Sequence, residues 1–366
     1  MSLSLKKIFL MVVRFGVVLT CMSNIRGFAD NDSLAYIQWR GDYFGDEIDY
    51  LDYVSSSSGG TIPQSLANSA FEVGTSIGRF GTVNYGYIVN QGTATRKTQP
   101  FKIKSATRAH QIGFSKGLGK ALSHSWLFTS YLQHRSQGKE AIDCFERLGL
   151  VIGGNCSEAD FRLIDGDATL SGTQANSLSV LSTAGESRSA LLQVTATRDV
   201  LALGVVTHAV GFKASSVNFS SQSPLFDIES PFLLSSKIGG VSLNDVIEDV
   251  RRRSPQQDSW QEYVFSYGLG LRRDLLRNAS GGLDLTYYRV WRNGYIPTAG
   301  QPAFDSNFSF AVSLTYDPSK HWSYTVGAEA FTNYLLGVDE IAYNQTTVRY
   351  FDEPYGRVTA AITFNF

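Results

Sequence analysis

The chain has 366 residues with a formal charge of −1, and it is rich in aromatic residues, with 18 Tyr and 23 Phe. So balanced a charge argues against a nucleic-acid-binding protein, which would carry a strongly basic surface. No window of 18 apolar residues occurs outside the N-terminal region, which excludes a helical membrane protein but leaves a β-barrel open, because barrel strands show apolar residues only at alternate positions.

The N-terminus has the order of a secretory signal peptide. Three basic residues precede an apolar stretch over 15–22, and a small-residue site, Gly-Phe-Ala, follows at 27–29. We therefore predict a signal peptide over 1–29 and one mature domain over 30–366. Cleavage would remove four basic residues and no acidic one, which takes the formal charge to −5.

The mature chain alternates between apolar and polar residues, most cleanly over 305–316 and 353–366, as expected of strands with one face in lipid. A β-sandwich would alternate too, but here short and long connections also alternate, which is typical of barrels with tight periplasmic turns and long external loops. Segments 161–170 or 232–240 could add a hairpin, so fourteen strands stay possible. We predict twelve strands, at 33–42, 70–80, 82–91, 104–117, 124–136, 186–198, 201–213, 261–274, 281–292, 305–316, 322–334 and 353–366.

The third external loop, at about 137–185, contains the two cysteines that would remain after cleavage. In a secreted protein the simplest interpretation is a disulfide between Cys144 and Cys156, and the alternative is two reduced, buried thiols. So small a ring would stabilise the loop by about 2 to 3 kcal/mol. The loop could fold into the lumen and narrow it, or cap the rim. A short helical pattern is formed by Ala141, Ile142, Phe145 and Leu148.

The fourth external loop, at about 214–260, contains a predicted helix. The segment Ser242-Leu243-Asn244-Asp245 resembles a capping box, and the helix would end in Arg251-Arg252-Arg253. Cations at a helix C-terminus interact favourably with its dipole, so a solvated helix end explains the three arginines. The alternative is a basic patch that binds lipopolysaccharide or an anionic substrate.

The alternation, the aromatic residues near the strand ends and the terminal segment Ile362-Thr363-Phe364-Asn365-Phe366 resemble Gram-negative outer-membrane β-barrel proteins of the porin-like kind. This resemblance implies an all-β fold, a transmembrane antiparallel up-and-down β-barrel in the bacterial outer membrane. It also implies that Ile362, Phe364 and Phe366 form a signal for the barrel-assembly machinery. Outer-membrane lipid and lipopolysaccharide are then expected partners.

One short segment resembles a lipid hydrolase. His134-Arg135-Ser136-Gln137-Gly138 is similar to the His-x-Ser-x-Gly segment of outer-membrane phospholipase A, which implies Ser136 as nucleophile and His134 as general base. We expect both to face lipid, because they share parity with Trp126, Phe128 and Leu132. The family's orienting Asn has no counterpart in 186–197, so Glu186 would have to replace it. The motif is weak, and rim strands often carry His and Ser.

The leading functional prediction is a channel for passive passage of small hydrophilic solutes, with no metal and no other cofactor. The predicted strand facing directs charged side chains of both signs into the lumen, which suits a narrow, water-filled pore. A closed, salt-bridged core is the alternative. A surface-exposed structural or adhesion barrel and, less well supported, a lipid hydrolase are the other functional classes. The predicted lumen residues are Arg40, Arg272, Asp284, Glu329 and Arg357.

Overall fold

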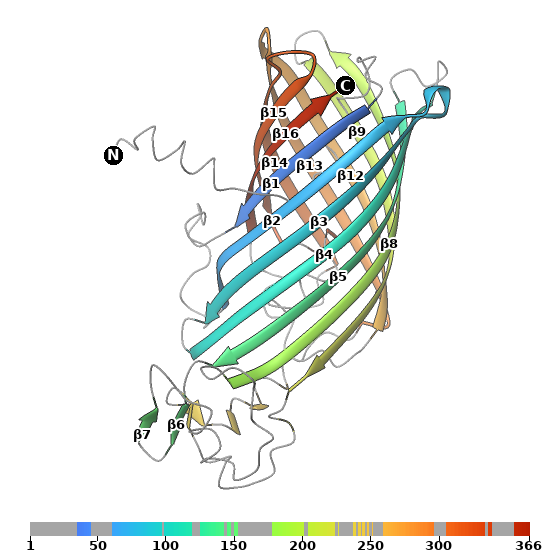
Figure 1. Ribbon diagram of the computed structural model, residues 1–366. Helices are drawn as coiled ribbons and strands as arrows, with labels where there is room; N and C mark the ends of the chain where they lie inside the picture. The colour runs from blue at the N-terminus through green and yellow to red at the C-terminus, as the bar shows by residue number, and fades with distance from the viewer. Residues whose placement is uncertain are drawn as a thin grey trace, which may run out of the picture.

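The chain forms a closed, twelve-stranded antiparallel barrel, as predicted (Figure 1). The computed structural model describes residues 35–44, 61–96, 99–118, 125–142, 145–147, 150–152, 178–200, 204–223, 226, 237–238, 241–242, 244–245, 247–248, 251, 259–295, 305–333, 336–338 and 355–366. The barrel strands are β1 (Ala35–Phe44), β2 (Thr61–Ser76), β3 (Thr82–Arg96), β4 (Gln99–Gly117), β5 (Ser125–Ile142), β8 (Leu178–Val200), β9 (Gly204–Gln222), β12 (Ser259–Leu276), β13 (Ala279–Asn293), β14 (Ser306–Tyr316), β15 (Trp322–Phe331) and β16 (Tyr355–Asn365).

Each strand pairs with its neighbour in this order, and the last strand closes the ring against the first. In the β1–β16 ladder, Tyr36 lies opposite Asn365, and the Phe366 amide donates to the Ala35 carbonyl oxygen at 2.9 Å. Because all backbone groups along a closed barrel can pair between strands, this architecture leaves no sheet edge facing lipid. No helix among the described residues is long and apolar enough to cross a membrane.

The turns at the end of the barrel that holds the C-terminus are tight. Between β2 and β3 the chain makes a single 3-10 turn, η3 (Gly78–Phe80), and leaves it through Gly81. Gly81 has a φ of +125°, and a Cβ there would lie 2.2 Å from the Ser115 carbonyl oxygen. A glycine is therefore required by both conformation and space. By the usual rule for bacterial barrels, this is the periplasmic end.

The outer face of the barrel carries a belt of exposed apolar side chains. On β14, alternate residues from Phe308 to Tyr316 are 38 to 54% exposed, and Ile37, Trp39, Tyr324 and Ile362 continue the belt across the closure. The polar residues between them face inward. Exposed apolar side chains in such number are stable only against lipid, so the barrel wall spans a membrane.

Several strands extend further from the periplasmic end than the sequence indicated. β5 continues to Ile142 and β8 starts at Leu178, so the predicted helical pattern at 141–148 is wrong, because its first two residues belong to a strand. Beyond the barrel, β6 (Phe145–Arg147), β7 (Leu150–Ile152), β10 (Lys237–Ile238) and β11 (Val241–Ser242) form a separate sheet, the outer sheet, in the order β11-β10-β6-β7.

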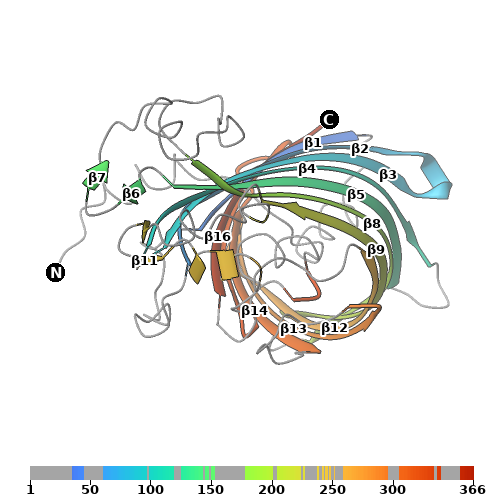
Figure 2. The same ribbon diagram turned by 90° about the horizontal axis from the view of Figure 1, so that it is seen from below.

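The outer sheet joins the third and fourth external connections, since Lys237 of β10 pairs with Glu146 of β6. Viewed along the barrel, it lies outside the ring of strands (Figure 2). Segment 232–240 therefore adds a short strand to this sheet and none to the barrel, so fourteen barrel strands was the wrong alternative. Segment 161–170 lies outside the described residues. Residues 244, 245, 247, 248 and 251 are helical, as the capping-box pattern predicted.

Candidate functional site: the barrel lumen

The inner wall of the barrel is mainly polar. On β8, alternate residues from Thr183 to Thr195 face inward, and the buried ones include Ser187, Ser189, Gln193 and Thr195. An apolar patch interrupts this lining, where Leu132 packs against Ala70, Ile88 and Ala109. A small barrel can be filled by a packed apolar core. The polar lining of this one suits contact with water or hydrophilic solutes instead.

Charged residues in the lumen occur largely as pairs of opposite sign. Arg357 and Glu329 lie opposite each other on β16 and β15, and the Arg357 Nε donates to the Glu329 Oε2 at 2.8 Å. The Arg357 guanidinium also lies over the ring of Phe331, 5.3 Å from its centroid. These contacts bury the pair almost completely, with side-chain exposures of 2% and 8%.

Two further pairs line the wall of β12 and β13. The Arg292 Nε lies 3.7 Å from the Glu262 Oε2 near the external end, and the Arg272 Nη2 lies 4.0 Å from the Asp284 Oδ2 nearer the periplasm. Because each pair is neutral as a whole, these charges create local dipoles along the lumen without a strong net field.

Two cavities follow one another inside the barrel. The larger, about 500 Å³, opens at the periplasmic turns and includes Gln38, Glu72 and Arg272 in its wall. The second, about 140 Å³, lies deeper in the lumen and is lined by polar side chains, among them Lys213 and Glu329, and also by apolar ones. A space of about 20 Å³ lined by both Arg272 and Asp284 shares wall residues with each. The Arg272–Asp284 pair therefore joins the walls of the two cavities.

The deeper cavity is bounded by a short segment that follows β15. We call residues 332, 333 and 336–338 the inward segment. Asn307, which is 0% exposed, holds it by its side chain: the Nδ2 donates to the Leu336 carbonyl oxygen at 3.0 Å, and the Oδ1 accepts from the Asn333 amide at 2.9 Å. The Asn333 Nδ2 donates in turn to the Ser306 carbonyl oxygen at 2.7 Å.

Apolar packing and one lysine fix the far end of the inward segment. Leu336 is fully buried against Val264 and Val290 of the β12–β13 wall. Gly337 has a φ of +78°, and a Cβ there would meet Val290 at 3.0 Å. Lys213 of β9 donates from its Nζ to the Val338 carbonyl oxygen at 3.2 Å. Contacts to β9, β12, β13 and β14 therefore hold this segment inside the lumen, where it narrows the route.

The five predicted lumen residues all point into the barrel. Arg40, Glu329 and Arg357 are buried in it, and Arg272 and Asp284 face each other between the two cavities. Their part in solute passage stays a prediction. Cys144 and Cys156 lie outside the described residues, so their disulfide also stays a prediction. Of the predicted basic patch in the fourth loop, Arg251 lies over the ring of Phe226, 5.5 Å from its centroid, and 252–253 are outside the described residues.

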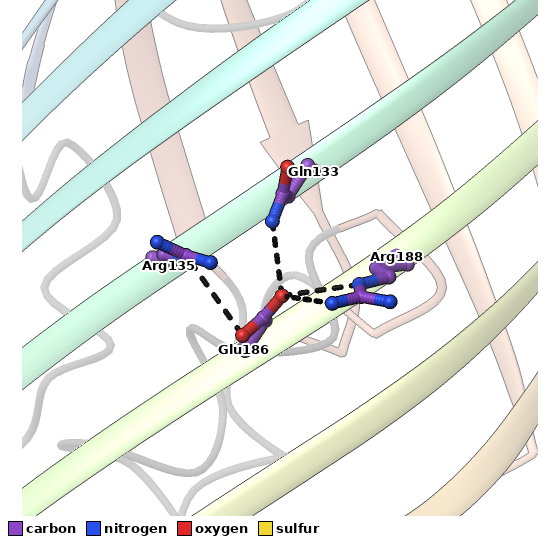
Figure 3. A network of polar contacts seen from close by, with 4 residues as sticks. All are labelled: Gln133, Arg135, Glu186 and Arg188. Atoms are coloured by element: carbon purple, nitrogen blue, oxygen red, sulfur yellow. Dashed lines mark hydrogen bonds and ion pairs between the residues drawn. The ribbon is translucent and has the colours of Figure 1, made fainter.

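The expected facing of His134 and Ser136 is wrong. Both are buried inside the barrel, 8% and 3% exposed, whereas the intervening Arg135 is exposed on the outer face. Glu186 also lies on the outer face, where its carboxylate contacts Gln133, Arg135 and Arg188 (Figure 3). A sheet one residue thick separates Glu186 from the other two side chains. The triad that the phospholipase resemblance implied therefore does not form in this structure.

The terminal aromatic residues cluster on the outer face of the closing strand. The rings of Phe364 and Phe366 contact each other edge to face, with 4.9 Å between their centroids, and the centroids of Trp322 and Phe364 are 4.8 Å apart. If Phe366 is part of an assembly signal, Phe366→Ala should refold in vesicles close to wild type but accumulate less in the outer membrane of cells. Parallel refolding and cell-fractionation measurements check this. Equal losses in both would assign Phe366 to stability alone.

No local sequence pattern indicates the inward segment. Its anchors, Asn307 and Lys213, are 25 or more residues away from the groups that they bind, and neither stands in a recognisable motif. The third loop was the expected constriction, and most of that loop lies outside the described residues. The constriction that the described part of the chain shows comes from the last external connection instead.

No protein-family model and no curated protein sequence matches the chain. Among solved structures, the translocator domain of the autotransporter NalP from Neisseria meningitidis is similar, with a TM-score of 0.53 and 10% identity over 93% of this chain and 90% of that one. The fold is that of an outer-membrane β-barrel. The apolar belt and this fold together place the barrel in the bacterial outer membrane.

Two other similar structures have lower scores. The transport unit of the autotransporter AIDA-I from Escherichia coli has a TM-score of 0.42 at 7% identity, covering 99% of this chain and 96% of that one. The KdgM porin has a TM-score of 0.35 at 7% identity, over 90% of this chain and 99% of that one. We base the fold assignment on the NalP domain.

Proposed function

We propose that the barrel is a channel for passive passage of small hydrophilic solutes that are uncharged or zwitterionic, and that the inward segment sets its width. The observation that carries this proposal is the succession of two cavities in the lumen, both with charged side chains in their walls and with the Arg272–Asp284 pair between them. The pairwise charges favour solutes without net charge. The narrowness of a twelve-stranded barrel favours small ones.

Replacing residues 332–338 by a Gly-Ser linker of equal length should raise the single-channel conductance about twofold or more, because ion flow through a pore is limited by its narrowest part. The measurement is the conductance of the purified protein in planar bilayers. Asn307→Ala should give a smaller rise in conductance, because it removes one anchor of the inward segment. Ser309→Ala is the matched control, because the inward hydroxyl that it removes bonds Tyr288 and not the inward segment.

Three results would count against the proposal. Absence of discrete conductance steps in both the wild type and the linker variant would contradict a channel. Equal steps in both would show that the inward segment does not set the width. A strong preference for cations or for anions would contradict passage of solutes without net charge.

The outer sheet supports a second candidate, a barrel that presents a binding surface to the cell exterior. It joins two external connections through the pairing of β6 with β10. A loop that only shields the barrel rim does not require such a paired sheet. Replacing 237–242 by a linker separates the two functions. It should leave conductance unchanged if the barrel is a channel, and abolish binding of whole cells to a surface if the outer sheet is an adhesin.

A further inference from the structure

A basic cluster lies on the outside of the barrel, away from the lumen. It consists of Arg108 on β4, Arg135 and Lys139 on β5 and Arg188 on β8, all exposed. Glu186 is the single acidic residue among the described residues of these three stretches, 106–110, 133–139 and 182–190. The cluster therefore has a formal charge of +3.

The strand register brings the cluster together. Arg108 lies opposite Arg135 on the neighbouring strand, and Arg135 lies opposite Glu186. Residues in such cross-strand pairs have their Cβ atoms about 5 Å apart. Like charges placed directly opposite each other destabilise a sheet, so the Arg108–Arg135 pair is unfavourable unless an anion lies between the two side chains.

Glu186 orients the cluster without neutralising it. One carboxylate oxygen accepts from the Gln133 Nε2 at 3.0 Å and from the Arg188 Nε at 3.1 Å, and the other lies 3.6 Å from the Arg135 Nε (Figure 3). Both guanidinium groups keep most of their surface in the open, with side-chain exposures of 66% and 60%. Guanidinium groups held in this way present further N–H donors in a geometry that suits a phosphate.

The position of the cluster along the membrane normal indicates the kind of ligand that it binds. The three arginines lie nine to twelve residues from the periplasmic ends of their strands at Gly117, Ser125 and Val200. With a rise of about 3.3 Å per residue and a tilt of about 40°, this is roughly 23 to 30 Å above the periplasmic turns. The apolar band of an outer-membrane barrel is about 25 Å tall, so the cluster lies at its external border.

Exposed apolar side chains lie directly below the cluster, toward the periplasm. Each arginine has an exposed apolar residue four positions away on its own strand. These residues are Ile112, Tyr131 and Leu192, which are 57%, 47% and 52% exposed. Acyl chains can pack on these side chains while a phosphate at the head of the same molecule reaches the guanidinium groups. This combination matches an acylated, phosphorylated glycolipid of the outer leaflet.

We propose that Arg108, Arg135 and Arg188 form a binding site for the phosphate groups of lipopolysaccharide on the outside of β4, β5 and β8. This site is independent of the lumen and of solute passage. Its occupant neutralises the excess positive charge, and Glu186 keeps the guanidinium groups of Arg135 and Arg188 in place. Arg289 supplies a matched control, because it lies ten residues above Ala279 on the outer face of β13 but is neutralised by Asp305 at 2.7 Å.

The test is a titration of the purified full chain in detergent with bisphosphorylated lipid A. Arg135→Gln/Arg188→Gln should weaken binding about tenfold or more, because each exchange removes a charge-assisted contact to phosphate. Arg108→Gln should weaken lipid A binding severalfold. Arg108 is outside the Glu186 network of Figure 3, so this variant replaces the double variant as the test if the double variant does not fold. Arg289→Gln should leave binding unchanged.

Equal affinity in all four proteins would overturn the proposal, since the lipid would then be held by apolar contacts alone. Two competition experiments identify the ligand class. Phosphatidylglycerol binding as tightly as lipid A, with the same loss in the double variant, would show a general phospholipid site. Displacement of lipid A by millimolar inorganic phosphate would show a site for the free anion. We expect neither, because two phosphates and several acyl chains contact the site together.

Discussion

Ile362→Arg is expected to prevent most of the chain from refolding into lipid vesicles. Ile362 stands on the outer face of β16, 38% exposed, between Trp39 and Tyr324 of the adjacent strands. A charge on the lipid face costs about 2 to 4 kcal/mol near the middle of the bilayer and less toward its borders. Removing the apolar isoleucine side chain from lipid adds roughly 1.5 kcal/mol or more to this loss of folding free energy.

Thr363→Arg is the matched control, because Thr363 faces the periplasmic cavity and accepts a hydrogen bond from the Gln38 Nε2 at 2.9 Å. An arginine there can extend into polar space and should refold nearly as well as wild type. The folded fraction is read from heat-modifiable migration on gels. Equal losses for the two variants would contradict the facing of β16.

The barrel and its strand number could be predicted because lipid imposes a strict rule on one face of each strand. Over 308–316 and 356–366 the outward residues are apolar or glycine, so alternation alone determines their facing. The rule holds only inside the apolar band. β5 and β8 continue beyond it, and there their outward residues include Gln137, Lys139 and Glu186, so the predicted β5 ends too early and the predicted β8 begins too late.

The wrong facing of His134 and Ser136 has the same origin. Trp126, Phe128 and Leu132 share their parity, and an apolar side chain normally indicates the lipid face. In β5 these residues point inward, where Leu132 joins an apolar patch on the lumen wall that depends on β2, β3 and β4. Neither that patch nor the contact of Lys213 with Val338 has a local signal. Both depend on strands that are far apart in sequence.

Glu329→Ala is expected to lower the free energy of unfolding by about 3 to 5 kcal/mol, because it leaves the Arg357 guanidinium buried without its carboxylate. Arg357 donates to Glu329 through both its Nε and its Nη2, and its side chain is only 2% exposed. The exposed Arg289–Asp305 pair is the control: Asp305→Ala should cost less than about 1 kcal/mol, since water solvates the remaining arginine. Urea titration of the protein in vesicles measures both.

Replacing both partners separates the cost of an unpaired charge from the contribution of the pair. Glu329→Met/Arg357→Met removes the buried charges together, and such exchanges are often neutral or stabilising, so most of the loss seen in Glu329→Ala should be recovered. Because Glu329 lines the deeper cavity, the double variant also makes the lumen more apolar at that level. Its conductance should therefore fall while its stability returns, a combination that a purely structural ion pair would not produce. A double variant as unstable as Glu329→Ala would instead show that the pair itself holds β15 and β16 in register.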